Sequence, residues 1–399
     1  MNLDELLGRA VAAGASDIHM KVNQPPMLRV DGAIVPMEGA PTLTSDDLNA
    51  LLQVAGSAAP HRLATFRETG ELDASYETAQ ETRFRVNGFR QRGQVSIAMR
   101  FIPRTIPSFE DLHMPPGIRR LAEMHHGLVL VTGATGAGKS TTLAAMVRHI
   151  NKTRSEHIVT IEDPIEVIHP DENCIVNQRE IGIDTGSFSE ALRRALRQDP
   201  DTILIGELRD SETATTALQA AESGHLVLST MHTVDSSETI GRMIEFFPAD
   251  KQPMIRSILA GVLRGVISQR LLPRKNGGRI AAVEVMVTNE RIADLIRDAL
   301  PEDIPTAIDE GSFYEMQTLS KALIDLVLAG MVEREVAAGV APNKHDFMIA
   351  LTQAEKARAA RGMNQHANGD SQENPMAPRS ADDVEEAQAP PLRLLSEAG

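Results

Sequence analysis

The stretch from Gly133 to Ser140 fits the pattern G-x-x-x-x-G-K-[ST], whose residue types suit the binding of phosphate groups. Its glycines allow backbone angles at which consecutive N–H groups turn inward on a phosphate. Lys139 would then reach the β- and γ-phosphates of a nucleotide, and the Ser140 hydroxyl would reach a Mg²⁺ ion. The residues expected to bind the nucleotide are Gly133, Ala134, Thr135, Gly136, Ala137, Gly138, Lys139, Ser140 and Thr141.

The sequence on either side of this loop is typical of a strand and a helix. The apolar run from Leu128 to Val131 predicts a buried parallel strand, and Thr141 to Val147 predicts a helix. In this order the positive end of the helix points at the bound phosphate. A chance glycine-rich turn is the alternative, and the flanking strand and helix disfavour it.

Three other predicted strands end on side chains that could assist hydrolysis. Ligands bind beyond the carboxyl ends of the strands in α/β sheets, so we expect these side chains to meet at the phosphate loop. The residues are Glu162, Asp163 and Glu166 after the strand 157–161, Glu207 after the strand 202–205, and His232 after the strand 225–230.

Glu207 is the favoured general base for activating a water molecule, and Glu166 is a second polarising carboxylate. The common arrangement places an Asp immediately before this glutamate, but here the position is Gly206. Either Glu207 both activates the water and helps to hold Mg²⁺, or Mg²⁺ is held through water molecules by other carboxylates. Those carboxylates are Glu162, Asp163 and Glu166. A capping or ion-pairing role is the alternative for Glu207 and for Glu166.

His232 follows a strand end, two residues after Thr230, and could sense the γ-phosphate. A single histidine has a structural role more often than a catalytic one. On chain position alone, a structural role therefore stays open for His232 and for His225.

The developing charge of a phosphoryl transfer also requires a cation. The α/β part of the chain offers no obvious free arginine for this task. Two predicted strands of the first hundred residues, 82–87 and 95–102, and the turn between them carry arginines at positions 83, 85, 90, 92 and 100. One of them could reach the site from the same chain or from a neighbouring subunit, and a solvated sheet face is the alternative.

Composition shifts divide the chain into segments. Strands and helices alternate through its middle, which predicts an α/β fold with a mainly parallel sheet. The predicted segments are a smaller α+β domain over 1–104, a proline-bearing linker over 105–117, the α/β core over 118–290, a helical segment over 291–352, and a disordered tail over 353–399 that is poor in large apolar residues. Within the core, we expect one amphipathic helix from Asp250 to Leu272, and Ser211 as the cap of a helix that ends near Gly224.

Composition also limits the function. The single cysteine, Cys174, excludes an internal disulfide and a four-cysteine zinc site, and it favours a reducing compartment. The formal charge of −15 argues against binding to nucleic acid. We expect neither a signal peptide nor a membrane-spanning run of about 20 apolar residues. The expected location is cytoplasmic.

Taken together, these motifs resemble the secretion ATPases of the type II/type IV pilus (PilT/GspE) superfamily, and within it the twitching-motility (pilus retraction) ATPases. The resemblance extends from Ala15 to about residue 330. The matching stretches are Ala15-Ser-Asp-Ile-His19, Pro25-Pro-Met-Leu-Arg-Val-Asp-Gly32, Arg83-Phe-Arg-Val-Asn87, the phosphate loop, Thr160-Ile-Glu-Asp-Pro-Ile-Glu166, Val176-Asn-Gln-Arg-Glu180, Asp199-Pro-Asp201, Gly206-Glu-Leu-Arg-Asp210 and Gly224-His-Leu-Val-Leu-Ser-Thr-Met-His-Thr233.

The resemblance implies a PAS-like N-terminal domain, a RecA-like ATPase core and a homo-hexameric ring that hydrolyses ATP with Mg²⁺. It implies that Glu207 is the general base and Glu166 the acidic-box glutamate. The resemblance also marks His225 and His232 as His-box residues, and it assigns contact with the γ-phosphate to Arg85 and Arg100. The implied partners are the inner-membrane platform protein of the pilus machine and a paralogous motor ATPase. The implied location is the inner face of the cytoplasmic membrane.

The sequence disfavours two alternatives to this interpretation. A pilus assembly or type II secretion ATPase usually carries a paired CxxC metal site, which one cysteine cannot make. A regulatory nucleotide-binding module specific for guanine needs [NT]-K-x-D, and Asn151-Lys-Thr-Arg154 has Arg where Asp is required.

The sequence departs from the resembling family in one motif. The family's retraction signature is a helix of the type A-I-R-N-L-I-R-E, and Arg291-Ile-Ala-Asp-Leu-Ile-Arg-Asp298 matches it only in its second half.

Overall fold

The computed structural model describes residues 2–30, 32–102 and 104–369, with side chains described as far as residue 360. The chain divides into two compact units, residues 1–348 and residues 349–399. The first unit contains two sheets, and the described part of the second unit belongs to one helix. No described helix has the length and apolar character that crossing a membrane requires.

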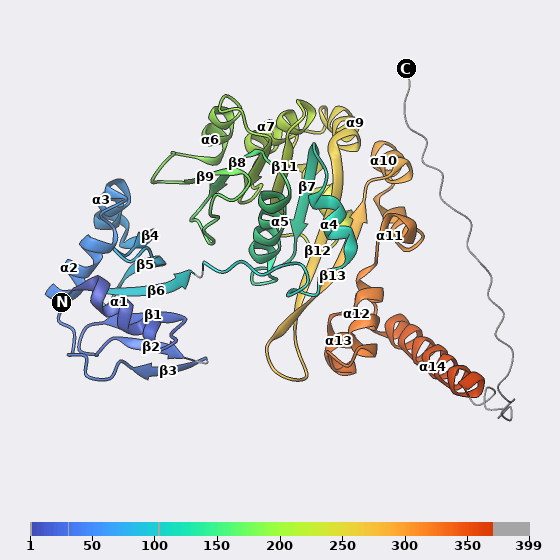
Figure 1. The fold of residues 1–399 in the computed structure, drawn as a ribbon. Coiled ribbons are helices and arrows are strands. Elements are labelled where there is room, and N and C mark those ends of the chain that lie inside the picture. Colours follow the sequence, from blue (N-terminus) through green and yellow to red (C-terminus); the bar gives the residue numbers. More distant parts are fainter. Residues whose placement is uncertain (1, 31, 103, 370–399) are drawn as a thin grey trace, which may run out of the picture. The chain divides into compact units, whose positions relative to one another are not determined.

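The first hundred residues form a six-stranded antiparallel sheet in the order β3-β2-β1-β6-β5-β4 (Figure 1). Helices α1 and α2 contribute apolar side chains to the same buried cluster as the sheet, including Leu7, Leu48 and Phe84. The strands are β1 (Asp17–Lys21), β2 (Met27–Val30), β3 (Ala33–Pro36), β4 (Glu71–Glu77), β5 (Arg83–Gln91) and β6 (Gln94–Ile102). The helices are α1 (Leu3–Ala12), α2 (Ser45–Ala55) and α3 (Pro60–Thr69). The predicted smaller α+β domain is therefore confirmed, although α3 and β4 were not predicted.

Helix α2 begins at Ser45, because Thr44 caps it. The Thr44 hydroxyl accepts a hydrogen bond from Asp47 N–H at 3.2 Å, and the Asp47 carboxylate accepts one from Thr44 N–H at 2.9 Å. This reciprocal pair satisfies two N–H groups that would otherwise lack partners at the helix start.

The second sheet has seven strands in the order β13-β12-β7-β11-β10-β8-β9. All neighbouring pairs are parallel except β12 with β13. The strands are β7 (Gly127–Thr132), β8 (His157–Glu162), β9 (Ile175–Glu180), β10 (Thr202–Ile205), β11 (Leu226–Met231), β12 (Leu263–Pro273) and β13 (Arg279–Val287). Every residue of β7, β10 and β11 is buried, which is typical of strands covered on both faces. The predicted α/β core with a mainly parallel sheet is confirmed.

Helices connect the strands of this sheet (Figure 1). They are α4 (Pro116–Ala122), α5 (Lys139–Thr153), α6 (Phe188–Ala195), α7 (Ser211–Glu222), α8 (Ser236–Glu245) and α9 (Gln252–Val262). Asp210 caps α7 by accepting from Thr213 N–H at 2.8 Å, so the predicted cap Ser211 is wrong by one residue. Ser211 is instead the first helical residue.

The single helix predicted from Asp250 to Leu272 is also wrong in its second half. Helix α9 ends at Val262, and the chain continues directly into β12. A Cβ atom at Gly265 would lie 2.5 Å from Met286 O, so the backbones of β12 and β13 pack too closely there for any side chain. The apolar pattern of this stretch suits a central strand as well as a helix, and pairing with β7 and β13 decides the outcome.

The region after β13 is helical, as predicted. Its elements are α10 (Glu290–Arg297), η1 (Pro301–Asp303), α11 (Ile304–Asp309), η2 (Ser312–Tyr314), α12 (Leu319–Leu328), α13 (Arg334–Val340) and α14 (Lys344–Gly369). The disorder predicted for 353–399 is wrong for 353–369, which continue α14. Ala, Gln, Glu, Lys and Arg are strong helix formers, and a shortage of apolar residues does not prevent a helix. Residues 370–399 lie outside the described part of the chain.

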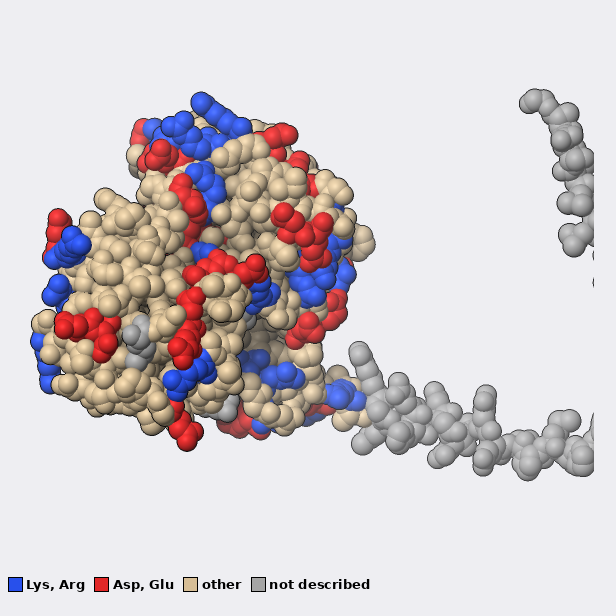
Figure 2. Space-filling model, turned by 60° about the vertical axis from the view of Figure 1, so that its left-hand side comes forward, with Lys and Arg blue, Asp and Glu red and all other residues tan. Residues whose placement is uncertain are grey.

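The predicted linker is partly packed against the core rather than exposed. Phe109 is buried in the core cluster, and Arg148 of α5 donates to Ile106 O at 2.8 Å. Figure 2 shows acidic and basic side chains interspersed in small groups over one face of the molecule. The formal charge of −15 is therefore not gathered into one acidic region on this face.

Candidate active site

The phosphate loop lies between β7 and α5, in the strand–loop–helix order that the sequence predicted. Gly133, Gly136 and Gly138 have φ angles of 141°, 81° and 90°, in the left-handed region that favours glycine. A Cβ atom at Gly133 would also lie 2.5 Å from Gln269 O of β12. The glycines are therefore required by backbone angle and, at Gly133, by the closeness of the neighbouring strand.

Lys139 is folded back onto the loop that precedes it. Its Nζ donates to Gly133 O at 2.7 Å and to Ala134 O at 3.2 Å, and the residue is buried. Burial lowers the pKa of the Lys139 ammonium, and the nearby Glu207 and Glu166 carboxylates oppose this shift. A phosphate oxygen is a stronger acceptor than these carbonyls, so the lysine is placed to exchange one for the other.

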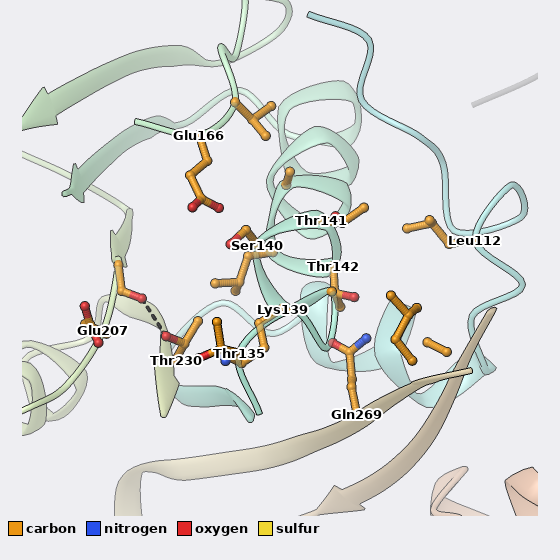
Figure 3. A pocket seen from close by; sticks show the side chains of 18 of the residues that line it. Leu112, Thr135, Lys139, Ser140, Thr141, Thr142, Glu166, Glu207, Thr230 and Gln269 are labelled. Carbon is orange, nitrogen blue, oxygen red and sulfur yellow. Dashed lines mark hydrogen bonds between the residues drawn. The ribbon is translucent and has the colours of Figure 1, made fainter. Parts of the chain in front are cut away.

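A cavity of about 1010 Å³ opens over the loop (Figure 3). Six of the nine predicted nucleotide-binding residues line it: Thr135, Gly136, Gly138, Lys139, Ser140 and Thr141. The other three, Gly133, Ala134 and Ala137, belong to the loop but not to the lining. The Ser140 and Thr141 residues at the start of α5 are exposed, so their hydroxyl groups are accessible from the cavity.

Glu207 also lines the cavity, two residues beyond the end of β10. Its side chain is 14% exposed and pairs with Arg209, and its Oε2 lies 3.4 Å from His232 Nε2. Within the described part of the chain, Oε2 accepts no hydrogen bond. Thr230 donates to Gly206 O at 2.7 Å and so fixes the backbone that carries Glu207 (Figure 3).

The acidic residues after β8 have three different environments. Glu162 is held by Thr160 Oγ1 at 2.7 Å and Gln178 Nε2 at 3.0 Å, and burial raises its pKa despite these hydrogen bonds. Asp163 accepts from Arg62 at 2.9 Å. Glu166 is half-exposed and points into the cavity (Figure 3). All three line the cavity, and Glu166 has the greatest freedom to contact a ligand.

Two of the five candidate arginines reach this cavity from the N-terminal sheet. Arg85 and Arg100 lie directly opposite each other on β5 and β6, and both line the cavity. Arg85 lies 3.5 Å from Glu166, and Arg100 donates to Asp17 Oδ1 at 2.7 Å. The structure therefore brings these arginines to the phosphate loop of their own chain.

The two histidines lie at opposite ends of β11. His232 follows the carboxyl end and lines the cavity. His225 precedes the amino end, and its Nδ1 lies 3.0 Å from Ala220 O and 3.0 Å from Ser223 Oγ. His225 does not line the cavity, because the length of β11 separates it from His232.

The structure adds lining residues that the sequence did not indicate. They include Gln269, Leu271, Arg274, Arg279 and Ile280 of the β12–β13 hairpin, His169 of the β8–β9 connection, and Leu112, His113 and Met114 before α4. Gln269 is 2% exposed, and both polar atoms of its amide lack a partner among the described residues. Its strand was predicted as a helix, so no signal in the sequence placed Gln269 beside the loop.

A glycine loop between a strand and a helix, with a glutamate beyond β10, a parallel strand that β11 separates from β7, defines a RecA-like P-loop nucleotide-binding domain. Residues 1–333 match the family model described as type II/IV secretion system protein, and the chain belongs to that family.

Similar proteins include two bacterial relatives and a solved structure. The chain is 45% identical over 335 residues to the type IV pilus retraction ATPase PilT of Pseudomonas aeruginosa, with 84% of this chain and 96% of that protein covered. It is 41% identical over 323 residues to a twitching motility protein of Neisseria gonorrhoeae, with 81% and 86% covered. A crystal structure of the pilus retraction motor PilT with bound ADP superposes with a TM-score of 0.79 at 42% identity, covering 87% of this chain and 98% of that one.

Proposed function

We propose that this chain is an ATP-hydrolysing motor that powers type IV pilus retraction, the movement that underlies twitching motility. The observation that carries the proposal is the 45% identity to a pilus retraction ATPase across 84% of the chain. The site agrees with it, because the phosphate loop, Glu207 and two arginines line one cavity.

The described side chains divide the hydrolysis of ATP among them. Lys139 leaves the carbonyls of Gly133 and Ala134 and binds the β- and γ-phosphates. Glu207 takes a proton from the attacking water through Oε2, the oxygen that accepts no hydrogen bond within the described chain. His232, 3.4 Å from that oxygen, orients the carboxylate and contacts the γ-phosphate. Arg85 and Arg100 stabilise the negative charge that develops on the transferred group.

The residues also fit a Mg²⁺ ion, which would neutralise charge on the β- and γ-phosphates. The exposed Ser140 hydroxyl at the start of α5 would be its protein ligand. Glu162 and Asp163 are already hydrogen-bonded to other side chains, so they would act through water. Glu207, with one oxygen unpaired among the described residues, is the carboxylate best placed to hold such a water.

The proposal includes the assembly in which the motor works. Six copies form a ring, and hydrolysis changes the position of the N-terminal domain relative to the core. The ring acts on the inner-membrane platform protein of the pilus machine, from the cytoplasmic side of the membrane, beside a paralogous motor ATPase. The arginines on the N-terminal domain support this mechanism, since any movement of that domain changes the charge at the cavity.

Complementation of a retraction-deficient strain tests the proposal. Pseudomonas aeruginosa that lacks its own PilT would receive this chain or its Glu207→Gln variant, and the diameter of the twitching zone would be measured. We expect twitching with the wild-type chain and none with the variant at equal protein level. Purified protein that hydrolyses ATP but never restores twitching would contradict the retraction function and leave the ATPase activity standing.

A further inference from the structure

Glu180 is a buried carboxylate at the edge of the seven-stranded sheet. It is the last residue of β9, pairs with Glu162 of β8, and is 1% exposed. Its own N–H donates to Asp184 Oδ2 at 2.8 Å, which fixes the backbone at this point. A carboxylate so fully removed from water needs hydrogen-bond donors to offset its lost hydration.

Two of these donors come from the N-terminal domain. Ser75 Oγ of β4 donates to Glu180 Oε1 at 2.8 Å, and the Arg83 guanidinium of β5 donates to Oε2. Arg83 also donates to Ser75 Oγ at 2.9 Å, so the three side chains form a closed triangle. The Arg83 side chain is 13% exposed, against 44% for Arg85, so this ion pair is far better shielded from water than the one at Glu166.

A third donor comes from the loop that presents Glu166 to the cavity. Ile165 N–H donates to Glu180 Oε2 at 3.2 Å, and Glu166 is the next residue. At the other end of this short loop, Asp163 accepts from Arg62 of α3 at 2.9 Å. Both ends of the loop are therefore tied to the N-terminal domain, one directly and one through Glu180.

We propose that Glu180 is a positioning residue that couples docking of the N-terminal domain to the placement of Glu166 in the nucleotide site. When Arg83 is docked, its charge stabilises the buried carboxylate in the orientation that accepts from Ile165 N–H. When Arg83 withdraws, the carboxylate has to follow it or take up water, and either change releases Ile165 N–H. The inference rests on the proposed function, since it states how movement of that domain reaches the catalytic carboxylates.

Two substitutions in the full-length protein test this coupling. Glu180→Gln keeps one oxygen acceptor, which can serve Ile165 N–H or Ser75 but not both, and it removes the charge that holds Arg83. We expect kcat for ATP to fall about tenfold or more while KM changes less than about twofold, because misplacement affects the reacting groups and not the phosphate loop. Arg83→Gln should show the same loss, and the double variant should be no worse than either single one. Glu77→Gln is the matched control, because Glu77 is the half-exposed partner of Arg83 at 3.6 Å.

Hydrogen exchange supplies a readout that does not depend on turnover. In Arg83→Gln, exchange over residues 163–167 should become faster although the substitution is in the other domain, and in Glu77→Gln it should stay at the wild-type rate. The coupling is excluded if this exchange is unchanged in Arg83→Gln, or if kcat, nucleotide affinity and the thermal midpoint of Glu180→Gln all fall together. A wild-type protein without ATPase activity would instead reject the proposed function, while the exchange measurement still decides the coupling.

Discussion

The two sides of the nucleotide cavity are built in different ways. On the core side, Lys139 is buried, and it follows β7, whose six residues are all buried. On the other side, Arg85 and Arg100 have side chains that are 44% and 72% exposed, on strands of a separately packed sheet. The core side is fixed by close packing around the loop. The arginine side depends on where a whole domain is placed.

The energies of the two sides differ accordingly. The half-exposed Arg85–Glu166 pair stabilises the fold by about 0–1 kcal/mol, as is usual for surface ion pairs. Its arginine is therefore available to a nucleotide at little cost in stability. Movement of the N-terminal domain can add or remove this charge while the phosphate loop keeps its shape.

The largest expected effect is on the core side. Lys139→Ala should reduce kcat/KM for ATP about a thousandfold or more and weaken nucleotide binding, because the phosphates lose their buried cation. Steady-state ATPase rates and titration with a fluorescent ATP analogue measure the two effects. Lys152→Ala, at the exposed end of the same helix, is the control and should match wild type. Retained activity in Lys139→Ala would show that the core side is not the phosphate site.

Glu207→Gln should slow the chemical step of ATP hydrolysis without weakening nucleotide binding. The amide cannot accept a proton from water, so kcat should fall about 10²–10⁴-fold while nucleotide affinity stays within a few-fold of wild type. Single-turnover rates and equilibrium binding provide the comparison. Glu212→Gln, an exposed carboxylate on α7 that pairs with Arg193, should have no effect on either quantity. If kcat falls only slightly in Glu207→Gln, Glu207 is not the general base, and Glu166 is the next candidate.

On the arginine side we expect a smaller loss of kcat, and a mixture of two inactive variants tests which subunit the arginine serves. Arg85→Ala should lower kcat about 10–100-fold, since one of the two stabilising arginines is removed while Arg100 and the loop are intact. Arg92→Ala, at the exposed turn between β5 and β6, is the control.

Because Arg85 reaches Glu166 of its own chain, an equimolar mixture of Arg85→Ala and Glu207→Gln should remain as inactive as its components. Each subunit of such a mixture lacks one half of its own site. Recovery of turnover in the mixture would show instead that the arginine acts on a neighbouring subunit, and the two sides of the cavity would then belong to different chains.

The contrast between the closely packed core side and the arginine side of the cavity also explains which features the sequence could predict. The phosphate loop, Glu207 and the strand β10 were predicted within a residue or two, because local spacing and apolar runs specify them. Gln269 and the β12–β13 hairpin were missed, since the apolar pattern from Asp250 to Leu272 suits a helix and only pairing with β7 shows it to be a strand. The resemblance marks both His225 and His232, but they lie at opposite ends of β11.

The sequence could not predict which segments that lie far apart in the chain contact each other. The need for a cation was inferred from chemistry, and the resemblance pointed to Arg85 and Arg100. Residue type and spacing alone do not distinguish them from Arg83, which lies two residues from Arg85 on the same strand and forms a buried ion pair with Glu180. Which arginine meets the nucleotide and which holds the domains together depends on the packing of two sheets, and the spacing of residues does not encode it.

The smallest expected effect concerns pH, and it lies on the core side. His169 lines the cavity, and burial lowers its pKa from 6.5 to about 4, so it is neutral in the folded protein. An unfolded chain binds a proton at this histidine below pH 6.5, and the folded chain does not until about pH 4. The stabilisation is therefore present above pH 6.5 and lost as the pH falls toward 4, by about 3 kcal/mol. Thermal midpoints at pH 7 and 5 should differ less for His169→Gln than for wild type, while His61→Gln, an exposed histidine on α3, should behave as wild type. Asp17, whose pKa is lowered by hydrogen bonds from Arg100 and Ser16 that outweigh burial, contributes stability that is lost only below pH 3.8. If the thermal midpoint changed equally with pH in wild type and in His169→Gln, His169 on the core side would not be the source of the acid sensitivity.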